Sequence, residues 1–463
     1  MEREVRSQRL GGWKAIARYL GRDRATAMRW ETSRGLPVHR VPGGGRASVY
    51  AFGEELDEWL GRYDGGVEDQ SSDLAGKKAT GGLQRRTVLA GSVGLAASGL
   101  VGIGLFRRLE TQSDVELLLE QARILRNQNT FETQNQAIGL AREAVRLAPQ
   151  NADAWGALGY AEASASRWRP ENVSKALRER AVMNGQRALD LDPGNAKGEL
   201  ALATALPLLD YDGWLARENG LDRAFERDPT DPDVIFERAW IYRHTGHCSL
   251  SASTCELLDP SARTAPLFNS WSRALWSSGQ TEKRDETIAR GIELYPTNKM
   301  LWFTNIEMTL FGGDPESAIS LVRDLRRRPT LASEGEIADI LDIAHTLTGS
   351  NPARFDGLLT RLIVSARTSI RAARNAVRVA SIAGRPDEAL KVIRAHLFAE
   401  GFAVGESVGS GLSIPMSQRH TNYLFEPPLV PLWQEKGLED IFENVGLERF
   451  WKISRSPPDF RRK

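Results

Sequence analysis

One turn motif recurs four times in this chain of 463 residues, and the recurrence constrains the fold more than any other feature. The four segments read LAPQNADAW, LDPGNAKGE, RDPTDPDVI and LYPTNKMLW, and their prolines are Pro149, Pro193, Pro229 and Pro296. Successive prolines are 44, 36 and 67 residues apart, and the last interval is close to two repeats. A small residue lies five positions before each proline, and a tryptophan lies six positions after two of them: Ala144, Ala188, Ala224, Gly291, Trp155 and Trp302.

Each of these positions has a physical use in a stack of helix hairpins. A small residue lets two helices cross closely, and a tryptophan fills the space between repeats. A proline suits the first position of a helix, because the N–H that it lacks would have no partner there. The pattern resembles the tetratricopeptide repeat (TPR), a helix–turn–helix unit of about 34 residues. The resemblance implies a mainly α-helical, TPR-like solenoid over residues 109–400, with about six to eight helix pairs and a groove that holds a peptide or protein partner.

The pattern is irregular in the middle and late parts of this region. The segment His244–Pro260 interrupts it, and Cys255 takes the place of the small residue. After Pro329 the turn motif is lost, although helical periodicity continues through three further segments, Ile337–Leu347, Phe355–Ala366 and Ala372–Ile382.

Residues 401–463 differ from the repeats because they are rich in aromatic side chains: Tyr423, Phe425, Trp433, Phe442, Phe450 and Trp451. A repeat array needs a terminal segment that covers its last apolar face, so we predict that this segment is a C-terminal cap. The segment also loosely resembles the tails of bacterial regulators that join a winged helix to TPRs. The alternative is an ordinary terminal pair of helices.

The first 62 residues have a different pattern. Trp13, Ile16, Ala17 and Leu20 fall on one face of a short helix that Gly21 ends, and a second helix is predicted from the N-cap Asp23 to about Glu31. Two extended runs, Val38–Val41 and Ala47–Phe52, then flank a glycine-rich turn. Between Val5 and Arg46 there are ten lysines and arginines and two acidic residues, whereas the whole chain has a net charge of +1. Such a local basic excess is typical of nucleic-acid binding.

The segments GWKAIARYLG, RDRATAMRWE, GLPVHR and ASVYAF…ELDEWL together resemble the winged helix-turn-helix of the MerR and excisionase superfamily. The resemblance implies binding of double-stranded DNA over residues 1–62. It places the contacting side chains on the second helix and the wing: Arg22, Arg24, Thr26, Arg29, Arg40 and Arg46. The alternative is a winged helix that contacts protein instead of DNA.

Residues 63–84 are rich in glycine and polar residues and are predicted to be a flexible linker. The next segment, 85–108, contains twenty uncharged residues between two pairs of arginines, which predicts a single transmembrane helix. The positive charge preceding it favours a cytoplasmic N-terminal domain and a periplasmic repeat domain, in the inner membrane of a bacterium. Small residues recur along one face of this segment and could pair two copies in a homodimer: Ala90, Gly94, Ser98 and Gly102.

Few residues in the chain are candidates for chemistry. His244, His247, Cys248 and Cys255 can bind metals, but their spacing matches no common zinc motif, so we predict no metal site. Cys248 and Cys255 flank a serine-rich connection that we expect to be irregular, and they could form a disulfide in an oxidising compartment; the alternative is two unlinked thiols. No phosphate-binding loop or nucleophile motif is present, so we predict neither an enzyme nor a bound cofactor.

Together these features predict a membrane-tethered, DNA-binding transcription regulator whose repeat domain senses or binds a partner. The layout is similar to that of ToxR-like and CadC-like regulators, although their DNA-binding domains are of another winged-helix type. The alternative is a membrane-anchored TPR scaffold for protein–protein interaction whose winged helix does not bind DNA.

Overall fold

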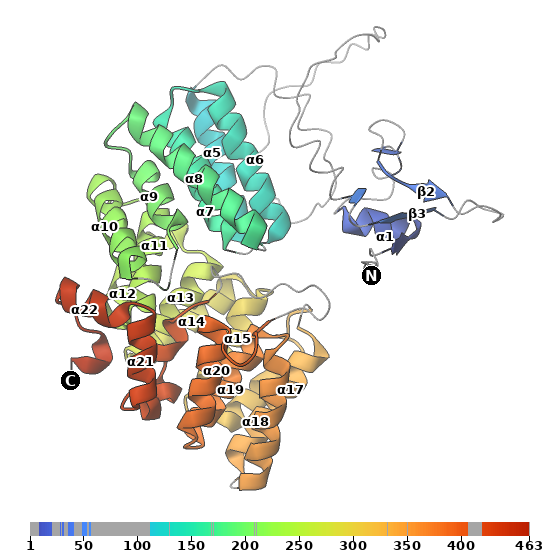
Figure 1. Ribbon diagram of the computed structural model, residues 1–463, viewed down its shortest axis with the longest axis vertical. Coiled ribbons are helices and arrows are strands. Elements are labelled where there is room, and N and C mark those ends of the chain that lie inside the picture. The colour runs from blue at the N-terminus through green and yellow to red at the C-terminus, as the bar shows by residue number, and fades with distance from the viewer. Residues whose placement is uncertain are drawn as a thin grey trace, which may run out of the picture. The chain divides into compact units, whose positions relative to one another are not determined.

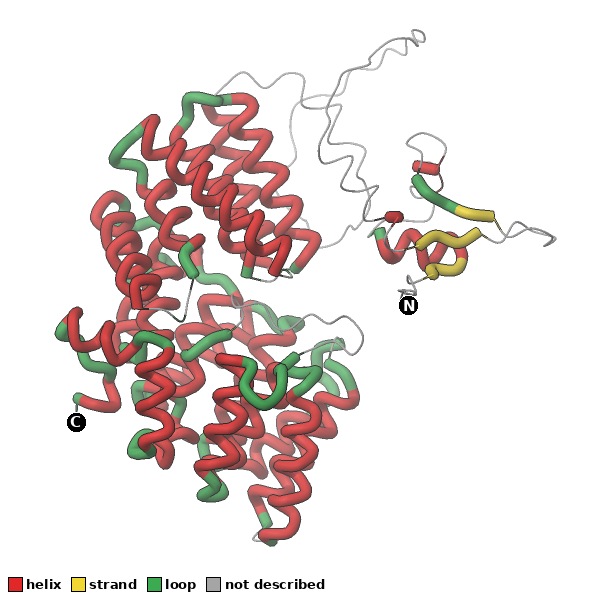
Figure 2. Tube along the Cα trace, in the orientation of Figure 1, coloured by secondary structure: helices red, strands yellow, loops and turns green. Residues whose placement is uncertain are grey.

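A computed structural model of the chain describes residues 9–20, 28, 30–31, 36–40, 49–52, 55–56, 112–128, 130–167, 169, 171–207, 209, 211–330, 332–349, 351–405 and 419–462. The chain divides into two compact units, Met1–Phe106 and Arg107–Lys463, which we describe separately (Figures 1 and 2).

The described part of the first unit is a short helix packed against a small antiparallel sheet. Its elements are β1 (Arg9–Gly11), α1 (Gly12–Tyr19), β2 (His39–Arg40) and β3 (Val49–Phe52), and the strand order is β1-β3-β2. A core of buried apolar side chains joins helix and sheet: Ile16, Ala17, Leu36, Val49, Ala51 and Leu56. The predicted first helix and the second extended run are therefore present. Most of the predicted second helix and the glycine turn lie outside the described residues, so the winged helix-turn-helix stays a prediction.

The predicted localisation, a single pass through a bacterial inner membrane, is corrected. In the part of the chain that the structure describes, no helix is long and apolar enough to span a bilayer. A span needs about 20 apolar residues, whereas the apolar α15 (Lys299–Phe311) has 13 residues and the 21-residue α8 (Glu171–Leu191) carries charged side chains along its length. Segment 85–108 and its small-residue face, on which the prediction was based, lie outside the described residues.

The described residues of the second unit form sixteen consecutive helices between positions 112 and 398, and these can be grouped into eight successive pairs (Figure 1). The helices are α5 (Gln112–Gln128), α6 (Phe131–Leu147), α7 (Ala152–Ser166), α8, α9 (Ala196–Ala205), α10 (Tyr211–Arg227), α11 (Pro232–His244), α12 (Cys248–Glu256), α13 (Ala265–Ser277), α14 (Thr281–Leu294), α15, α16 (Pro315–Arg323), α17 (Glu334–Thr348), α18 (Pro352–Ala366), α19 (Ile370–Ile382) and α20 (Pro386–Phe398). The mainly α fold class and the stack of helix pairs are confirmed.

The residue of the recurring turn that begins the next helix is not the proline that the sequence predicted. The four repeat prolines lie in the turns, and each helix begins three residues later. The residue two positions after each proline is the N-cap, and its side-chain oxygen accepts a hydrogen bond from a backbone N–H of the first helical turn: Asn151, Asn195, Asp231 and Asn298. These caps satisfy backbone donors that a helix cannot pair internally. The proline prediction was therefore wrong, and the asparagine or aspartate is the helix-starting residue.

The small residues of the motif have the predicted role. Ala144, Ala188 and Ala224 are fully buried, and a Cβ atom on Gly291 would lie 2.9 Å from the Cβ atom of Phe268. The tryptophans are less uniform. Trp302 is buried, whereas the half-buried Trp155 donates a hydrogen bond of 3.0 Å from Nε1 to the carbonyl oxygen of its own turn, at Pro149.

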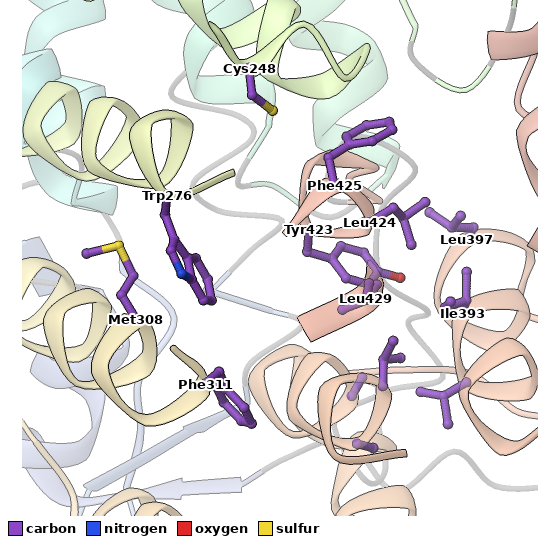
Figure 3. Packing of buried hydrophobic residues seen from close by; sticks show 14 of the residues in the cluster. Cys248, Trp276, Met308, Phe311, Ile393, Leu397, Tyr423, Leu424, Phe425 and Leu429 are labelled. Atoms are coloured by element: carbon purple, nitrogen blue, oxygen red, sulfur yellow. The ribbon is translucent and has the colours of Figure 1, made fainter. Parts of the chain in front are cut away.

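The C-terminal segment consists of η4 (Asn422–Phe425), η5 (Pro427–Leu432), α21 (Lys436–Asn444), α22 (Leu447–Ser454) and η6 (Asp459–Arg461). It folds back onto the middle of the array. Trp214 of α10 donates to the carbonyl oxygen of Val445 at 2.7 Å, and Trp451 donates to that of Thr245 at 2.8 Å. Figure 3 shows residues of η4 and η5 between side chains of α13 and α15 on one side and of α20 on the other.

The two cysteines lie in a helix where the sequence predicted an irregular connection. α12 runs from Cys248 to Glu256, and residues seven apart in an α-helix are about 10 Å apart along its axis. A disulfide requires two Cα atoms within about 4.4–6.8 Å. The predicted disulfide is therefore replaced by two buried, free thiols.

Two helical glycines give a matched test of the close stacking. A Cβ atom on Gly156 of α7 would lie 2.7 Å from the carbonyl carbon of Lys197 in α9, whereas one on the exposed Gly139 of α6 would meet nothing within 4 Å. We expect Gly156→Ala to lower the free energy of unfolding by about 1–3 kcal/mol. Gly139→Ala should raise it by about 0.5–1 kcal/mol, because alanine favours the helix. Urea denaturation followed by circular dichroism measures both, and an equal response of the two variants would contradict close stacking at Gly156.

Candidate functional site

The first helices of six pairs, α5, α7, α11, α13, α15 and α19, line one cavity of about 390 Å³. His420, two residues before η4, and Asn422, the first residue of η4, complete part of its wall. The second helices of the pairs do not contribute to this lining among the described residues. The cavity is therefore the inner face of the array, where one helix of each contributing pair presents its side chains.

The lining is strongly basic. It contains eight arginines and two carboxylates: Arg123, Arg126, Arg167, Arg243, Arg273, Arg371, Arg374, Arg378, Asp233 and Glu307. Two further carboxylates, Glu237 and Glu426, pair with arginines of the lining. Positive charge therefore remains in excess even when all four carboxylates are counted.

One group of charges surrounds Asp233 on α11. Its carboxylate pairs with Arg126 of α5, and Lys197 of α9 lies 3.1 Å away. Burial alone would raise the pKa of Asp233, but the positive charges of Arg126 and Lys197 outweigh burial and lower the pKa to about 2. This carboxylate is therefore ionised at neutral pH and joins three helices.

A second group surrounds Glu237, one helical turn further along α11. Arg167 donates to both carboxylate oxygens at 2.9 and 2.5 Å, and the hydroxyl of Tyr160 donates at 3.1 Å. Burial raises the pKa of Tyr160 well above its usual value, and the negative charge of Glu237 adds to the effect. Such two-point pairing fixes the guanidinium plane of Arg167 against the ring of Trp240, 4.6 Å from its centroid.

The third group joins α13, α15 and α19 to the C-terminal segment. Arg273 donates to Glu307 at 2.5 Å and to Glu426 at 3.0 Å. Arg378 donates to the same Glu426 at 2.7 and 2.9 Å. Burial opposes ionisation of Glu307, but Arg273, Arg378 and Arg371 outweigh it and hold the pKa of this carboxyl well below its usual range. Both carboxylates are therefore already shared between arginines.

Two arginines of the lining differ from the rest. Arg243 of α11 is 6% exposed, and Arg374 of α19 is half-buried. In the described part of the chain, neither guanidinium has a carboxylate within 4.0 Å, and neither Nε has a hydrogen-bond partner. Burial and the nearby positive charge of Arg273 lower the pKa of both to about 10. Both groups therefore carry their charge at neutral pH without a carboxylate of the described residues within 4.0 Å.

The histidines that the sequence singled out are used in packing. The ring of His244 stacks on Trp240 with centroids 3.6 Å apart, and its Nε2 lies 3.2 Å from Nδ1 of His420. His247 lies within hydrogen-bond distance of the carbonyl oxygen of Ser456, at 2.9 Å. His244 and His247 thus contact the C-terminal segment instead of meeting at one point.

The structure leaves the predicted DNA-contacting residues largely undescribed. Arg22, Arg24, Thr26, Arg29 and Arg46 lie outside the described residues, and Arg40 is placed in β2 without a description of its side chain. The sequence predicted a groove ligand but named no residue of the groove. A usable signal was present in IRAARNAVRVASI, where Arg371, Arg374 and Arg378 follow helical spacing on one face of an otherwise apolar segment. Nothing in the sequence indicates that these three arginines line the same cavity as Arg243 and Arg273.

No family model and no curated protein matches the chain. Among solved structures, the chain is similar to TTC0263, a thermophilic TPR protein of Thermus thermophilus, with 16% identity over 41% of this chain and 94% of that one and a TM-score of 0.30. It is also similar to YrrB, described as a TPR protein with an unusual peptide-binding site, with 19% identity, coverage of 42% and 94%, and a TM-score of 0.26. The Cut9–Hcn1 hetero-tetramer of the APC/C gives 14% identity, coverage of 71% and 55%, and a TM-score of 0.41. None of these similarities says what the present chain binds.

The pair His244 and His420 predicts a pH dependence of stability. Burial, together with neighbouring positive groups, lowers both pKa values well below 6.5, so the unfolded chain binds more protons than the folded one in mild acid. Stability should therefore fall as the pH falls from 7 to 5, by at most about 1.4 kcal/mol per pH unit for each histidine. Glu218 opposes the trend, because burial raises its pKa to about 7 and it gains protons on folding.

Comparison with a variant separates these contributions. His420→Gln removes one of the two histidines and leaves Glu218 in place, so its stability should fall less steeply with pH than that of the wild type. Urea denaturation at pH 7, 6 and 5 measures the difference. Identical slopes for the two proteins would show that these histidines do not titrate on unfolding.

Proposed function

We propose that the helical unit is a protein-interaction scaffold that binds a peptide segment of a partner protein in the groove between its helix pairs. One observation carries the proposal, namely that the first helices of six pairs present their side chains to a single cavity. A cavity of about 390 Å³ is within the range of about 300–1,000 Å³ that ligand sites occupy.

The character of the lining supports a polypeptide ligand. Phe236 and Met300 are half-buried and line the cavity, so each offers apolar surface to an incoming side chain. Arg371 lies over the ring of Phe303 with its guanidinium carbon 3.6 Å from the centroid, which gives a flat surface that is both cationic and aromatic. Aromatic groups and arginine are the residues that contribute most at protein interfaces.

A matched pair of methionine variants tests the proposal. Met300 lines the cavity, whereas Met183 of α8 is 69% exposed and does not line it. Peptides selected from a phage-displayed library against the full chain would be synthesised and titrated by fluorescence anisotropy. We expect Met300→Glu to weaken their binding at least tenfold, about 1.4 kcal/mol, because it places a carboxylate against the apolar part of the site. Met183→Glu should leave binding unchanged. Equal affinities for the two variants would place the peptide elsewhere on the chain.

A second candidate function, binding of double-stranded DNA by residues 1–62, is favoured by the local basic excess and by the packing of α1 on a three-stranded sheet. The proposed contacts are those of the sequence analysis, from Arg22 to Arg46. Combined with the scaffold, with residues 63–84 as a linker, this module would make the protein a transcription regulator that responds to a partner of its repeats.

Two arginine substitutions test this second function. Arg24→Ala and Arg29→Ala should each weaken specific DNA binding by about 1–3 kcal/mol if these side chains contact base edges. Binding of the full chain should also weaken steeply as salt rises, because each neutralised phosphate contributes about −0.9 to the slope of log affinity against log salt concentration. Gel-shift titrations at several salt concentrations provide both values. A flat salt response, together with unchanged binding by both variants, would favour the scaffold function alone.

A further inference from the structure

We propose that the ligand of the groove presents an anionic group, a carboxylate or a phosphate, which binds between Arg243 of α11 and Arg374 of α19. The inference rests on the proposed function, because it uses the same cavity, but it assigns the chemical class of the group that the site recognises.

Arg243 is a buried positive charge of the groove. Its side chain is more than nine-tenths buried and lines the cavity, and in the described residues no carboxylate lies within ion-pair distance of it. The other two buried arginines of the lining have such a partner; Arg126 pairs with Asp233 and Arg378 with Glu426. A buried charge without a counter-charge lowers stability, so its presence in a cavity indicates a charge that arrives with a ligand.

The carboxylates near Arg243 and Arg374 are already paired with other arginines. Five guanidinium groups line the part of the cavity formed by α11, α13 and α19, and they face two carboxylates, Glu307 and Glu426. They belong to Arg243, Arg273, Arg371, Arg374 and Arg378. Glu426 accepts from Arg273 and Arg378, whereas Glu307 accepts from Arg273 and lies 3.3 Å from Arg371. No oxygen of this pair is within 4.0 Å of Arg243 or Arg374, and five guanidinium groups against two carboxylates leave a net charge of +3.

Several hydrogen-bond donors of the lining have no partner among the described residues. The Nε atoms of Arg243 and Arg374 and the hydroxyl of Ser270 are buried and unpaired among the described residues, and all three side chains line the cavity. Arginine N–H groups form a planar fork that matches the oxygens of carboxylate and phosphate. One anion held between Arg243 and Arg374 would satisfy donors from α11 and α19 together.

The anion could belong to a small molecule or to a partner peptide, and these sources are separated by the probes. We would titrate the full chain with inorganic phosphate, with citrate, and with one groove-selected peptide carrying either a free or an amidated C-terminus. Each titration is followed by calorimetry and by the shift in Tm, because a ligand that binds the folded state raises Tm by mass action. Sodium chloride at equal ionic strength controls for general screening.

The variants are Arg243→Gln and Arg374→Gln, with Arg187→Gln on the exposed face of α8 as the matched control. We expect wild type and Arg187→Gln to bind at least one of the anionic probes with a rise in Tm. Both groove variants should bind that probe at least tenfold more weakly. In buffer without polyvalent anions, Arg243→Gln should keep or raise Tm, because it removes an uncompensated buried charge; a merely structural arginine would lower it.

Two results would overturn the inference. One is an equal response of all variants to the anions, and the other is no response of the wild type to any probe. Arg374→Gln keeps the test decisive if Arg243→Gln does not fold, because Arg374 is the less buried of the two. If the anion titrations fail while Met300→Glu still weakens peptide binding, this inference alone is wrong. Anion binding without any groove-selected peptide would instead remove the peptide scaffold.

Discussion

The arrangement of the helical unit depends above all on the carboxylate of Glu426. It comes from the C-terminal segment, and it accepts hydrogen bonds from Arg273 of α13 and from Arg378 of α19. All three side chains are largely buried, so loss of one partner of this ion pair would cost about 3–5 kcal/mol. The pairing therefore fixes where the C-terminal segment crosses the array. It also places His420 and Asn422, which precede Glu426 by a few residues, in the wall of the groove.

The groove itself follows from how closely the helix pairs stack. Buried alanines and glycines, such as Ala188 and Gly156, leave no room for larger side chains between neighbouring helices, and side-chain caps begin each helix at a fixed point of the turn. These two constraints set the position of each first helix relative to the next. The side chains on their inner faces consequently point into a common cavity instead of into separate hairpins.

The charges of the groove have unequal roles. Where an arginine meets a carboxylate, as at Asp233, Glu237 and Glu307, the pair joins side chains of different helices, and loss of one partner would leave a buried charge uncompensated. At Arg243 and Arg374 the described residues supply no carboxylate within 4.0 Å, and an unpaired buried charge is unfavourable. Binding sites commonly contain such locally unfavourable groups, because the bound ligand supplies the interaction that the protein lacks.

The sequence by itself determined the features that depend on local interactions. The repeat turns, the helical periodicity up to Ile382 and the small residues at the crossings could be predicted, because helices form through contacts between residues three or four apart. The return of the C-terminal segment to α10–α12, the helix at Cys248 and the convergence of Arg243 with Arg374 could not. Some of these features join residues that are more than a hundred positions apart, as where Trp451 donates to the carbonyl oxygen of Thr245. The others depend on the packing that such long-range contacts create. Only the folded chain brings such side chains together, and the groove and its charge are therefore properties of the tertiary structure.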